Sequence, residues 1–160
     1  MHFQLRESWC APACVQNALE RYGSRVGQKR IATLMGDEHG TRGSDAPDIL
    51  WALDFLKVPY RVYEGYHKGA ARSWLTRSAG VWPLILCVDD FDHWVLVAGG
   101  VGDRLYLFDS DTDVPSNVRA MGQHTLRPKT IVRRWRASRD SADNEAPYYA
   151  IAVLGPPAKR

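Results

Sequence analysis

Three side chains of this sequence are of the types that nucleophilic acyl transfer requires: the thiol of Cys10, the imidazole of His93 and the carboxylate of Asp109. A cysteine attacks as the thiolate, so it needs a base to take its proton, and that base needs a group to orient it. Cys10 comes just before the predicted start of a helix, where unpaired backbone N–H groups favour a negative charge. We therefore hypothesise that Cys10 is a nucleophile. The alternative is a small buried side chain, which is the role we expect for Cys14 and Cys87.

His93 and Asp109 stand at the ends of two neighbouring predicted strands. His93 opens the most apolar strand of the chain, and Asp109 closes the next one. Because adjacent antiparallel strands place the end of one beside the start of the other, Asp109 is predicted to hold the ring nitrogen of His93 that faces away from the thiol. Alone, His93 would more often be a surface or capping histidine, and Asp109 would more often be an ordinary turn residue at a strand end. The other four histidines show no such partner pattern: His2, His39, His67 and His124.

Gln4 lies six residues before Cys10. Its side-chain amide can join the backbone N–H of Cys10 in donating hydrogen bonds to the oxyanion that forms during acyl transfer. The spacing of Cys10 and Cys14 is not that of a zinc clip, and no second cysteine pair follows. The acidic run 109–113 lacks the Gly and Glu that a calcium loop needs at its sixth and twelfth positions. The sequence therefore predicts neither a metal ion nor another cofactor.

The elements that would position these residues are helices first and strands second. Helical spacing and end signals predict four helices: one with Pro12 in its first turn and Gly23 after its end, one at about 28–35, one capped by 44–47, and one at 70–78. Strand-like runs are predicted at 60–63, 84–88, 94–98, 105–108, 131–135 and 148–154. Residues 111–128 and 137–146 are predicted to form loops. This order predicts an α+β domain with N-terminal helices packed on an antiparallel sheet.

Length and composition narrow the class of protein. The chain has 160 residues, 45% hydrophobic and 24% charged, which suits one domain with a core and excludes collagen, coiled coil and extensive disorder. No apolar run approaches the roughly 20 residues of a membrane span, and the N-terminus lacks a secretory signal pattern. Three cysteines are too few for a disulfide scaffold. We expect a single domain over 1–160 and a cytoplasmic location.

Charge is unevenly distributed along the chain. Residues 114–139 hold seven Lys and Arg and no acid, whereas the whole chain has a net charge of only +3. Such a stretch can bind nucleic acid with a steep salt dependence, or it can be a solvated face. Because no nucleic-acid motif accompanies it, nucleic acid is not the expected partner. The acids Asp89, Asp90 and Asp92 would favour a basic substrate segment, and hold His93 charged, if they border the cleft.

The candidate residues also carry a resemblance to a known family. Gln4, five further residues and then Cys-Ala-Pro-Ala-Cys resemble the opening of the bacteriocin-processing double-glycine leader peptidases, which are papain-like cysteine proteases. Three later stretches resemble the same family in the same order: Gly43-Ser44 before a helix, the strand Trp82 to Leu86, and the strand His93 to Val97. Leu107 to Ser110 stands where the family has a strand ending in Asp-Pro. The resemblance covers about residues 4–113, and the remaining 114–160 are expected to be a basic loop and C-terminal strands.

The resemblance implies a papain-like fold and a bacterial cysteine peptidase. Its substrate would be a peptide or protein with a leader peptide or a Gly-rich cleavage site. Cys10 would be the nucleophile, His93 the general base and acid, Asp109 the orienting carboxylate and Gln4 the oxyanion donor. The chain departs from the family at three positions, Trp9, Ala11 and Ser110, and it has no transporter segments. Transpeptidation, deamidation and isopeptide cleavage use the same chemistry and remain open. A non-catalytic peptide-binding or nucleic-acid-binding module is the alternative from another class.

Overall fold

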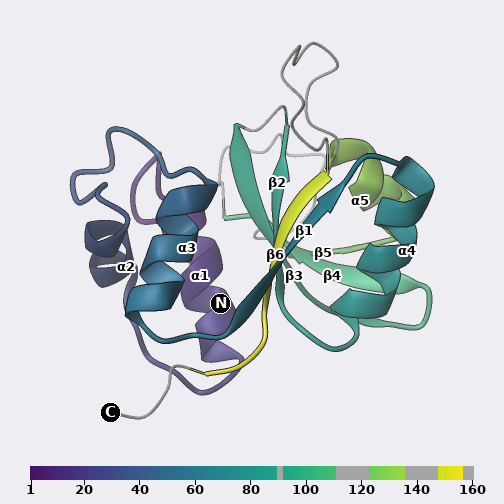
Figure 1. The fold of residues 1–160 in the computed structure, drawn as a ribbon, viewed down its shortest axis with the longest axis horizontal. Coiled ribbons are helices and arrows are strands. Elements are labelled where there is room, and N and C mark those ends of the chain that lie inside the picture. Colours follow the sequence, from purple (N-terminus) through teal and green to yellow (C-terminus); the bar gives the residue numbers. More distant parts are fainter. Residues whose placement is uncertain (90–91, 111–122, 136–147, 157–160) are drawn as a thin grey trace.

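A computed structural model describes residues 1–89, 92–110, 123–135 and 148–156 (Figure 1). Its helices are α1 (Cys10–Glu20), α2 (Gln28–Leu34), α3 (Ala46–Phe55), α4 (Lys68–Ala79) and α5 (Pro128–Arg134). Its strands are β1 (Tyr60–Gly65), β2 (Leu84–Val88), β3 (His93–Val101), β4 (Arg104–Phe108), β5 (Gln123–Leu126) and β6 (Tyr148–Val153). In this part of the chain, no helix has the length and apolar character needed to cross a membrane.

The strands form one sheet in the order β1-β6-β2-β3-β4-β5, and every neighbouring pair is antiparallel. The last strand of the chain, β6, therefore lies inside the sheet, between β1 and β2. The predicted strand meander is present in β2, β3 and β4, which are consecutive in both the chain and the sheet. The predicted α+β class, with the N-terminal helices packed on an antiparallel sheet, is confirmed.

Helices cover both faces of the sheet, on opposite sides of it in Figure 1. On one face α1, α2 and α3 pack against side chains that include Ile85 and Leu96. On the other face α4 and α5 pack against side chains that include Leu84 and Leu86. Successive residues of a strand point to opposite faces, so all five residues of β2 are buried. This explains why β2 is a continuous apolar run rather than an alternating one. The layer formed by α4 and α5 was not predicted.

Local signals account for the ends of the helices that border the site. The Asp45 carboxylate accepts a hydrogen bond from the Asp48 backbone N–H, and the Asp48 carboxylate accepts one from the Asp45 backbone N–H. This reciprocal capping box starts α3 where the sequence predicts it. At the start of α1, the N-cap residue Trp9 makes no capping hydrogen bond through its side chain. The backbone N–H groups in the first turn of α1, which carries Cys10, therefore donate no hydrogen bond to the Trp9 side chain.

Two predictions for the C-terminal part are wrong. Residues 131–135, predicted as a strand, belong to α5 and its C-cap Trp135. Pro128 suits the first turn of a helix, and the buried side chains of Ile131, Val132 and Trp135 share one helical face. An apolar run this short does not distinguish a strand from a buried helix. Strand β5 also lies within 111–128, which was predicted as a loop. Residues 111–122 and the predicted loop 137–146 lie outside the described residues.

Candidate active site

Cys10 is the first residue of α1, and its side chain belongs to the core that α1 forms with β3. The residue is only 8% exposed, and it lines a cleft at this end of the sheet. A thiol at this position is therefore held by packing on one side and open to the cleft on the other. The first turn of a helix carries backbone N–H groups without intrahelical partners, and these favour a negative charge near the start of α1.

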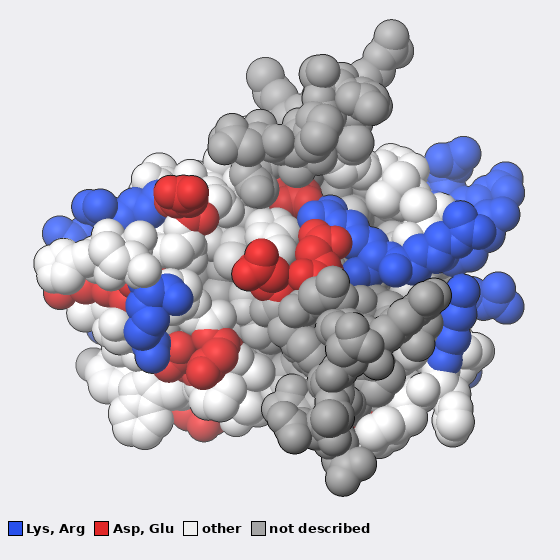
Figure 2. All heavy atoms as spheres, turned by 90° about the horizontal axis from the view of Figure 1, so that it is seen from above, with Lys and Arg blue, Asp and Glu red and all other residues white. Residues whose placement is uncertain are grey.

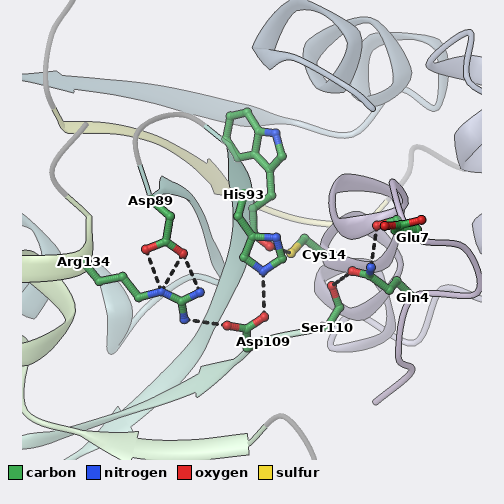
Figure 3. A network of polar contacts seen from close by, with 9 residues as sticks. Gln4, Glu7, Cys14, Asp89, His93, Asp109, Ser110 and Arg134 are labelled. Carbon is green, nitrogen blue, oxygen red and sulfur yellow. Dashed lines mark hydrogen bonds and ion pairs between the residues drawn. The ribbon is translucent and has the colours of Figure 1, made fainter. Parts of the chain in front are cut away.

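His93 and Asp109 meet as the strand pairing predicts. β3 and β4 are antiparallel, with Leu96 opposite Phe108, so the start of β3 and the residue after β4 lie at the same end of the sheet. The Nε2 atom of His93 is 2.7 Å from Oδ1 of Asp109 (Figure 3). The Cys10 side chain also lies close enough to the His93 ring to influence its pKa. Because Nε2 contacts Asp109, Nδ1 is the ring nitrogen available to the thiol. The structure thus brings the three predicted residues together.

The charged forms of His93 and Asp109 stabilise each other. Burial by itself lowers the pKa of His93, but the hydrogen bonds and negative charges of Asp109 and Cys10 outweigh it and raise that pKa to about 10. Burial also disfavours the charged form of Asp109, yet His93 and Arg134 together lower its pKa to about 2. His93 and Asp109 therefore form an ion pair throughout the neutral pH range. A cationic imidazole beside Cys10 favours the thiolate, which is the reactive form.

Arg134 contacts the other oxygen of Asp109. Its Nη1 is 2.5 Å from Oδ2 of Asp109, while Nε and Nη2 bind the Asp89 carboxylate at 2.7 to 3.1 Å (Figure 3). The sequence analysis counted Arg134 only as one of seven basic residues in 114–139 and did not connect it with the site. No local signal identifies it, because 25 residues separate it from Asp109 and 45 from Asp89.

Gln4 is held in a fixed orientation beside this group. Its Nε2 donates a hydrogen bond to the Glu7 carbonyl at 2.6 Å, and its Oε1 accepts one from the Ser110 hydroxyl at 2.9 Å (Figure 3). The primary amide has a second hydrogen on Nε2 that can serve an oxyanion. Asp109 and Ser110 are adjacent and buried, so one short segment orients both His93 and Gln4. The role of Gln4 as oxyanion donor stays a prediction.

The other two cysteines differ from Cys10 in their surroundings. Cys14 is fully buried, and its Sγ donates a hydrogen bond to the Trp94 carbonyl at 3.3 Å. Burial raises the pKa of Cys14 well above its ordinary value, and the nearby charges of Cys10 and Asp109 raise it further. Cys87 is buried in β2 and contributes to the wall of the cleft. Within the described ranges, no three or more His, Cys, Asp or Glu side chains are grouped to hold a metal ion.

The cleft at Cys10 and His93 has a volume of about 1490 Å³. Its walls come from residues 40–48, from residues at the end of β2 and the start of β3 that include Cys87 and His93, and from side chains of β1 and β6 that include Glu64 and Tyr149. Among the described residues, six carboxylates line it: Glu7, Asp45, Asp48, Glu64, Asp89 and Asp92. Figure 2 shows acidic side chains in the middle of this face, and Lys and Arg side chains on both flanks, with the larger group on the side where α4 and α5 lie.

Both arginines of the cleft already have carboxylate partners. Arg42 pairs with Asp48 at 2.6 Å, and Arg134 pairs with Asp89 and Asp109. Asp89 and Asp92 border the cleft, which is the condition that the sequence analysis set for a basic substrate segment. Asp90 lies outside the described residues. Asp89 is engaged by Arg134 and Asp48 by Arg42, so the negative charge of the cleft comes mainly from Glu7, Asp45, Glu64 and Asp92.

One wall of the cleft depends on a carboxylate that the sequence analysis missed. Asp37 is 2% exposed and accepts hydrogen bonds from the backbone N–H groups of Thr41 and Arg42 and from the Ser8 hydroxyl, at 2.9 to 3.1 Å. Burial disfavours its charge, but these hydrogen bonds outweigh burial and lower its pKa. Asp37 therefore fixes the segment 40–43 relative to the residues just before Cys10. Nothing in its local sequence distinguishes it from an ordinary turn acid.

No family model matches the sequence, and no curated protein sequence is similar to it. Several solved structures share its fold. The peptidase domain of Streptococcus ComA, a bi-functional ABC transporter involved in a quorum-sensing pathway, has a TM-score of 0.68 and 17% identity, over 95% of this chain and 96% of that one. A double glycine motif protease from an AMS/PCAT transporter, in complex with the leader peptide, has a TM-score of 0.65 and 18% identity, over 94% and 89%.

A third structure extends the comparison. A putative C39-like peptidase from Bacillus anthracis has a TM-score of 0.60 and 11% identity, over 100% of this chain and 94% of that one. At these identities the likeness concerns the fold. The chain has the papain-like α+β fold of these peptidase domains, and the fold implied by the sequence resemblance is confirmed.

Proposed function

We propose that this protein is a cysteine peptidase in which Cys10 is the nucleophile, His93 the general base and acid, Asp109 the orienting carboxylate and Gln4 an oxyanion donor. One observation carries this proposal: a buried carboxylate contacts an imidazole, this imidazole lies beside a thiol at a helix N-terminus, and the thiol and the imidazole both line an open cleft. The fold shared with three peptidase domains supports it.

The reaction follows from this arrangement. The thiolate of Cys10 attacks the carbonyl carbon of the scissile peptide, and the resulting oxyanion accepts hydrogen bonds from the Gln4 amide and the Cys10 backbone N–H. His93 gives its Nδ1 proton to the leaving amine as the C–N bond breaks, which leaves a thioester. His93 then takes a proton from water, the hydroxide displaces the thiolate, and the carboxylic acid product leaves. Asp109 keeps the ring oriented and balances its charge throughout.

We propose a peptide or protein substrate, with a leader peptide cleaved at a glycine-rich site as the first to test. The structural neighbour described as a double glycine motif protease in complex with a leader peptide supports this choice. Transpeptidation, deamidation and isopeptide cleavage would pass through the same thioester or use the same thiolate. They differ in which acceptor and donor enter the cleft.

The decisive experiment measures alkylation of each cysteine by iodoacetamide from pH 5 to pH 9, with the modified sites identified by mass spectrometry. We expect fast labelling of Cys10 alone at pH 6, because the imidazolium of His93 supports the thiolate. His93→Ala should slow this labelling, whereas His67→Ala, at an exposed position away from the cleft, should not. A Cys10 that reacts no faster than a model thiol would contradict the proposal. Cleavage of glycine-rich peptides, with and without an added amine, then distinguishes hydrolysis from transfer.

The substrate segment that enters the cleft should be cationic, because carboxylates outnumber arginines on its walls and both arginines are paired. Two methanethiosulfonates of opposite charge, trimethylammonioethyl and sulfonatoethyl, can test this at Cys10 without a known substrate. Relative to free cysteine, we expect a preference of about tenfold for the cation that weakens with salt. Glu64→Gln with Asp92→Asn should reduce it, and Glu38→Gln, outside the cleft, should not. A ratio equal to that of free cysteine would contradict a cationic substrate.

A further inference from the structure

We propose that Arg134 is a positioning residue of this active site that acts on the reaction through Asp109. The proposal rests on the proposed function, and it adds a fourth side chain, contributed by the opposite face of the sheet, to the group of Cys10, His93 and Asp109. Arg134 lines the cleft but contacts none of the atoms that would react. Its effect must therefore pass through the carboxylate that it binds.

The first step of the argument is the geometry at Asp109. The side chain of Asp109 is 1% exposed, and its two oxygens face different cationic donors. Oδ1 contacts Nε2 of His93 at 2.7 Å, and Oδ2 contacts Nη1 of Arg134 at 2.5 Å. Two donors on opposite oxygens define the plane of the carboxylate, and that plane sets the direction in which the His93 ring points. The Arg134 contact therefore restricts rotation of the carboxylate about its χ2 torsion.

The second step is that Arg134 is itself held in place. Its Nε and Nη2 bind the Asp89 carboxylate, and its backbone carbonyl accepts a hydrogen bond from the Asp89 backbone N–H at 3.3 Å. Asp89 directly follows β2, in the connection that leads to His93. Arg134 therefore joins the chain just before His93 to the residue that orients His93. A planar guanidinium can bridge two carboxylates in this way, whereas a lysine ammonium is a single point charge.

The third step concerns the helix that carries Arg134. α5 is anchored in the second core by Ile131, Val132 and Trp135, all of which are at most 2% exposed. Its next basic residue, Arg133, is exposed. Two adjacent arginines on one short helix thus have different surroundings. Arg134 points toward the site and Arg133 toward solvent, so Arg133 is a matched control for every measurement on Arg134.

The fourth step is the expected chemical effect. A carboxylate removed from water favours its protonated form unless a positive charge compensates. Arg134 supplies such a charge, in addition to His93, and so keeps Asp109 ionised as the pH falls. Once Asp109 takes a proton, it no longer balances the imidazolium or fixes the ring. Loss of Arg134 should therefore shift the acid limb in the pH profile of Cys10 reactivity to higher pH, with a smaller effect on the rate at pH 8.

The test uses the alkylation rate of Cys10 by iodoacetamide between pH 4 and pH 9. We expect Arg134→Met to lower the rate at pH 5 by about tenfold relative to wild type, which corresponds to a shift of about one pH unit in the acid limb. At pH 8 the rate should fall by less than threefold. Arg133→Met should reproduce the wild-type profile. In an Asp109→Asn background, Arg134→Met should cause little further loss, because its effect passes through Asp109.

Three outcomes overturn the proposal. One is a wild-type profile in a folded Arg134→Met variant, and another is an effect of equal size with and without Asp109. If Arg134→Met does not fold, as judged by circular dichroism, the same measurement is made on Arg134→Lys. We expect the acid limb of its profile to lie between those of wild type and Asp109→Asn. A wild-type profile in Arg134→Lys is the third outcome that overturns the proposal. The proposal for Arg134 can be overturned in these ways while Cys10 of the wild-type protein is still activated. A wild-type Cys10 without activation would instead overturn the proposed function, and with it this proposal.

Discussion

The two faces of the sheet contribute different parts of the candidate active site. The face covered by α1, α2 and α3 supplies the thiol of Cys10 and the cleft wall 40–48. The face covered by α4 and α5 supplies Arg134, whose guanidinium reaches Asp109. His93 and Asp109 stand at the end of the sheet between them. The candidate nucleophile and the arginine that supports Asp109 therefore lie on elements anchored in separate hydrophobic cores.

This division has a physical consequence. Cys10 owes its position to a helix start, which depends on local chain geometry. The ion pair of His93 and Asp109 receives additional support from a residue brought from the other face by the packing of α5. Substitutions that disrupt the first core should displace the Cys10 thiol. Substitutions that disrupt the second core should leave the thiol in place but weaken the electrostatic support of His93 and Asp109. The predictions below test that separation, beginning with the largest effect.

Within the first core, Cys10→Ala should abolish turnover while leaving the fold nearly intact, because the lost sulfur faces the cleft. Cys14→Ala, one helical turn further along, should keep turnover and reduce stability, by about 1 kcal/mol, through lost burial. Peptide cleavage and urea unfolding at neutral pH measure the two quantities. A loss of several kcal/mol in Cys10→Ala would identify Cys10 as a core residue, and surviving turnover would exclude it as the nucleophile.

Within the second core, Trp135→Ala should cost about 3–5 kcal/mol of unfolding free energy. Trp135 is fully buried, makes tilted or edge-on ring contacts with Tyr63, Trp74 and Tyr148, and donates its indole N–H to the Tyr149 carbonyl at 2.8 Å. Trp51→Ala is the matched control, because Trp51 is 65% exposed and should cost less than 1 kcal/mol. Thermal and urea unfolding measure both. Equal costs would contradict a tightly packed second core.

On the face covered by α1, α2 and α3, Gln4→Ala tests the predicted oxyanion role of Gln4. If the Gln4 amide serves the oxyanion, the rate should fall by roughly 10²–10³-fold with Cys10 alkylation little changed, because alkylation forms no oxyanion. Gln16→Ala, at a half-buried position on α1, is the control and should keep the rate. Steady-state cleavage of a peptide substrate measures the effect. A change of less than twofold would exclude the oxyanion role.

The smallest predicted effect concerns the pH dependence of stability. The pKa of His93 is about 10 in the folded protein, above its ordinary 6.5, so its stabilising contribution is complete below pH 6.5 and is lost as the pH rises through 10. For Asp109, with a pKa of about 2, the contribution is present above pH 3.8 and is lost as the pH falls through 2. The stability difference between wild type and His93→Gln should thus shrink from pH 7 to pH 10. Urea unfolding measures it, and a constant difference would contradict the ion pair.

The candidate residues were predictable to different degrees. Cys10, His93 and Asp109 are marked by their places at a helix start, a strand start and a strand end, and each place follows from a local pattern. Their meeting follows from the antiparallel pairing of two consecutive strands. Gln4 was singled out by its spacing from Cys10, and its contacts with Glu7 and Ser110 became visible only in the structure.

The fold was predictable to a similar extent. The helices α1 to α4 and the strands β2 to β4 agree with the predicted segments within a few residues. α5 was mistaken for a strand because a five-residue segment with three apolar members is too short to distinguish a strand from a buried helix. The central place of β6 was not predictable, since strand order depends on pairing between residues far apart in the chain.

The amino-acid sequence by itself determined the reactive groups and the local elements that carry them, because helix caps, turns and short apolar periods act over a few residues. Only the tertiary structure decided what surrounds those groups. It placed Arg134 on Asp109 across 25 residues, fixed the cleft wall through the buried Asp37, and gathered carboxylates from distant segments around the thiol. Burial and charge at a site depend on which segments pack together, and that packing is a property of the whole chain.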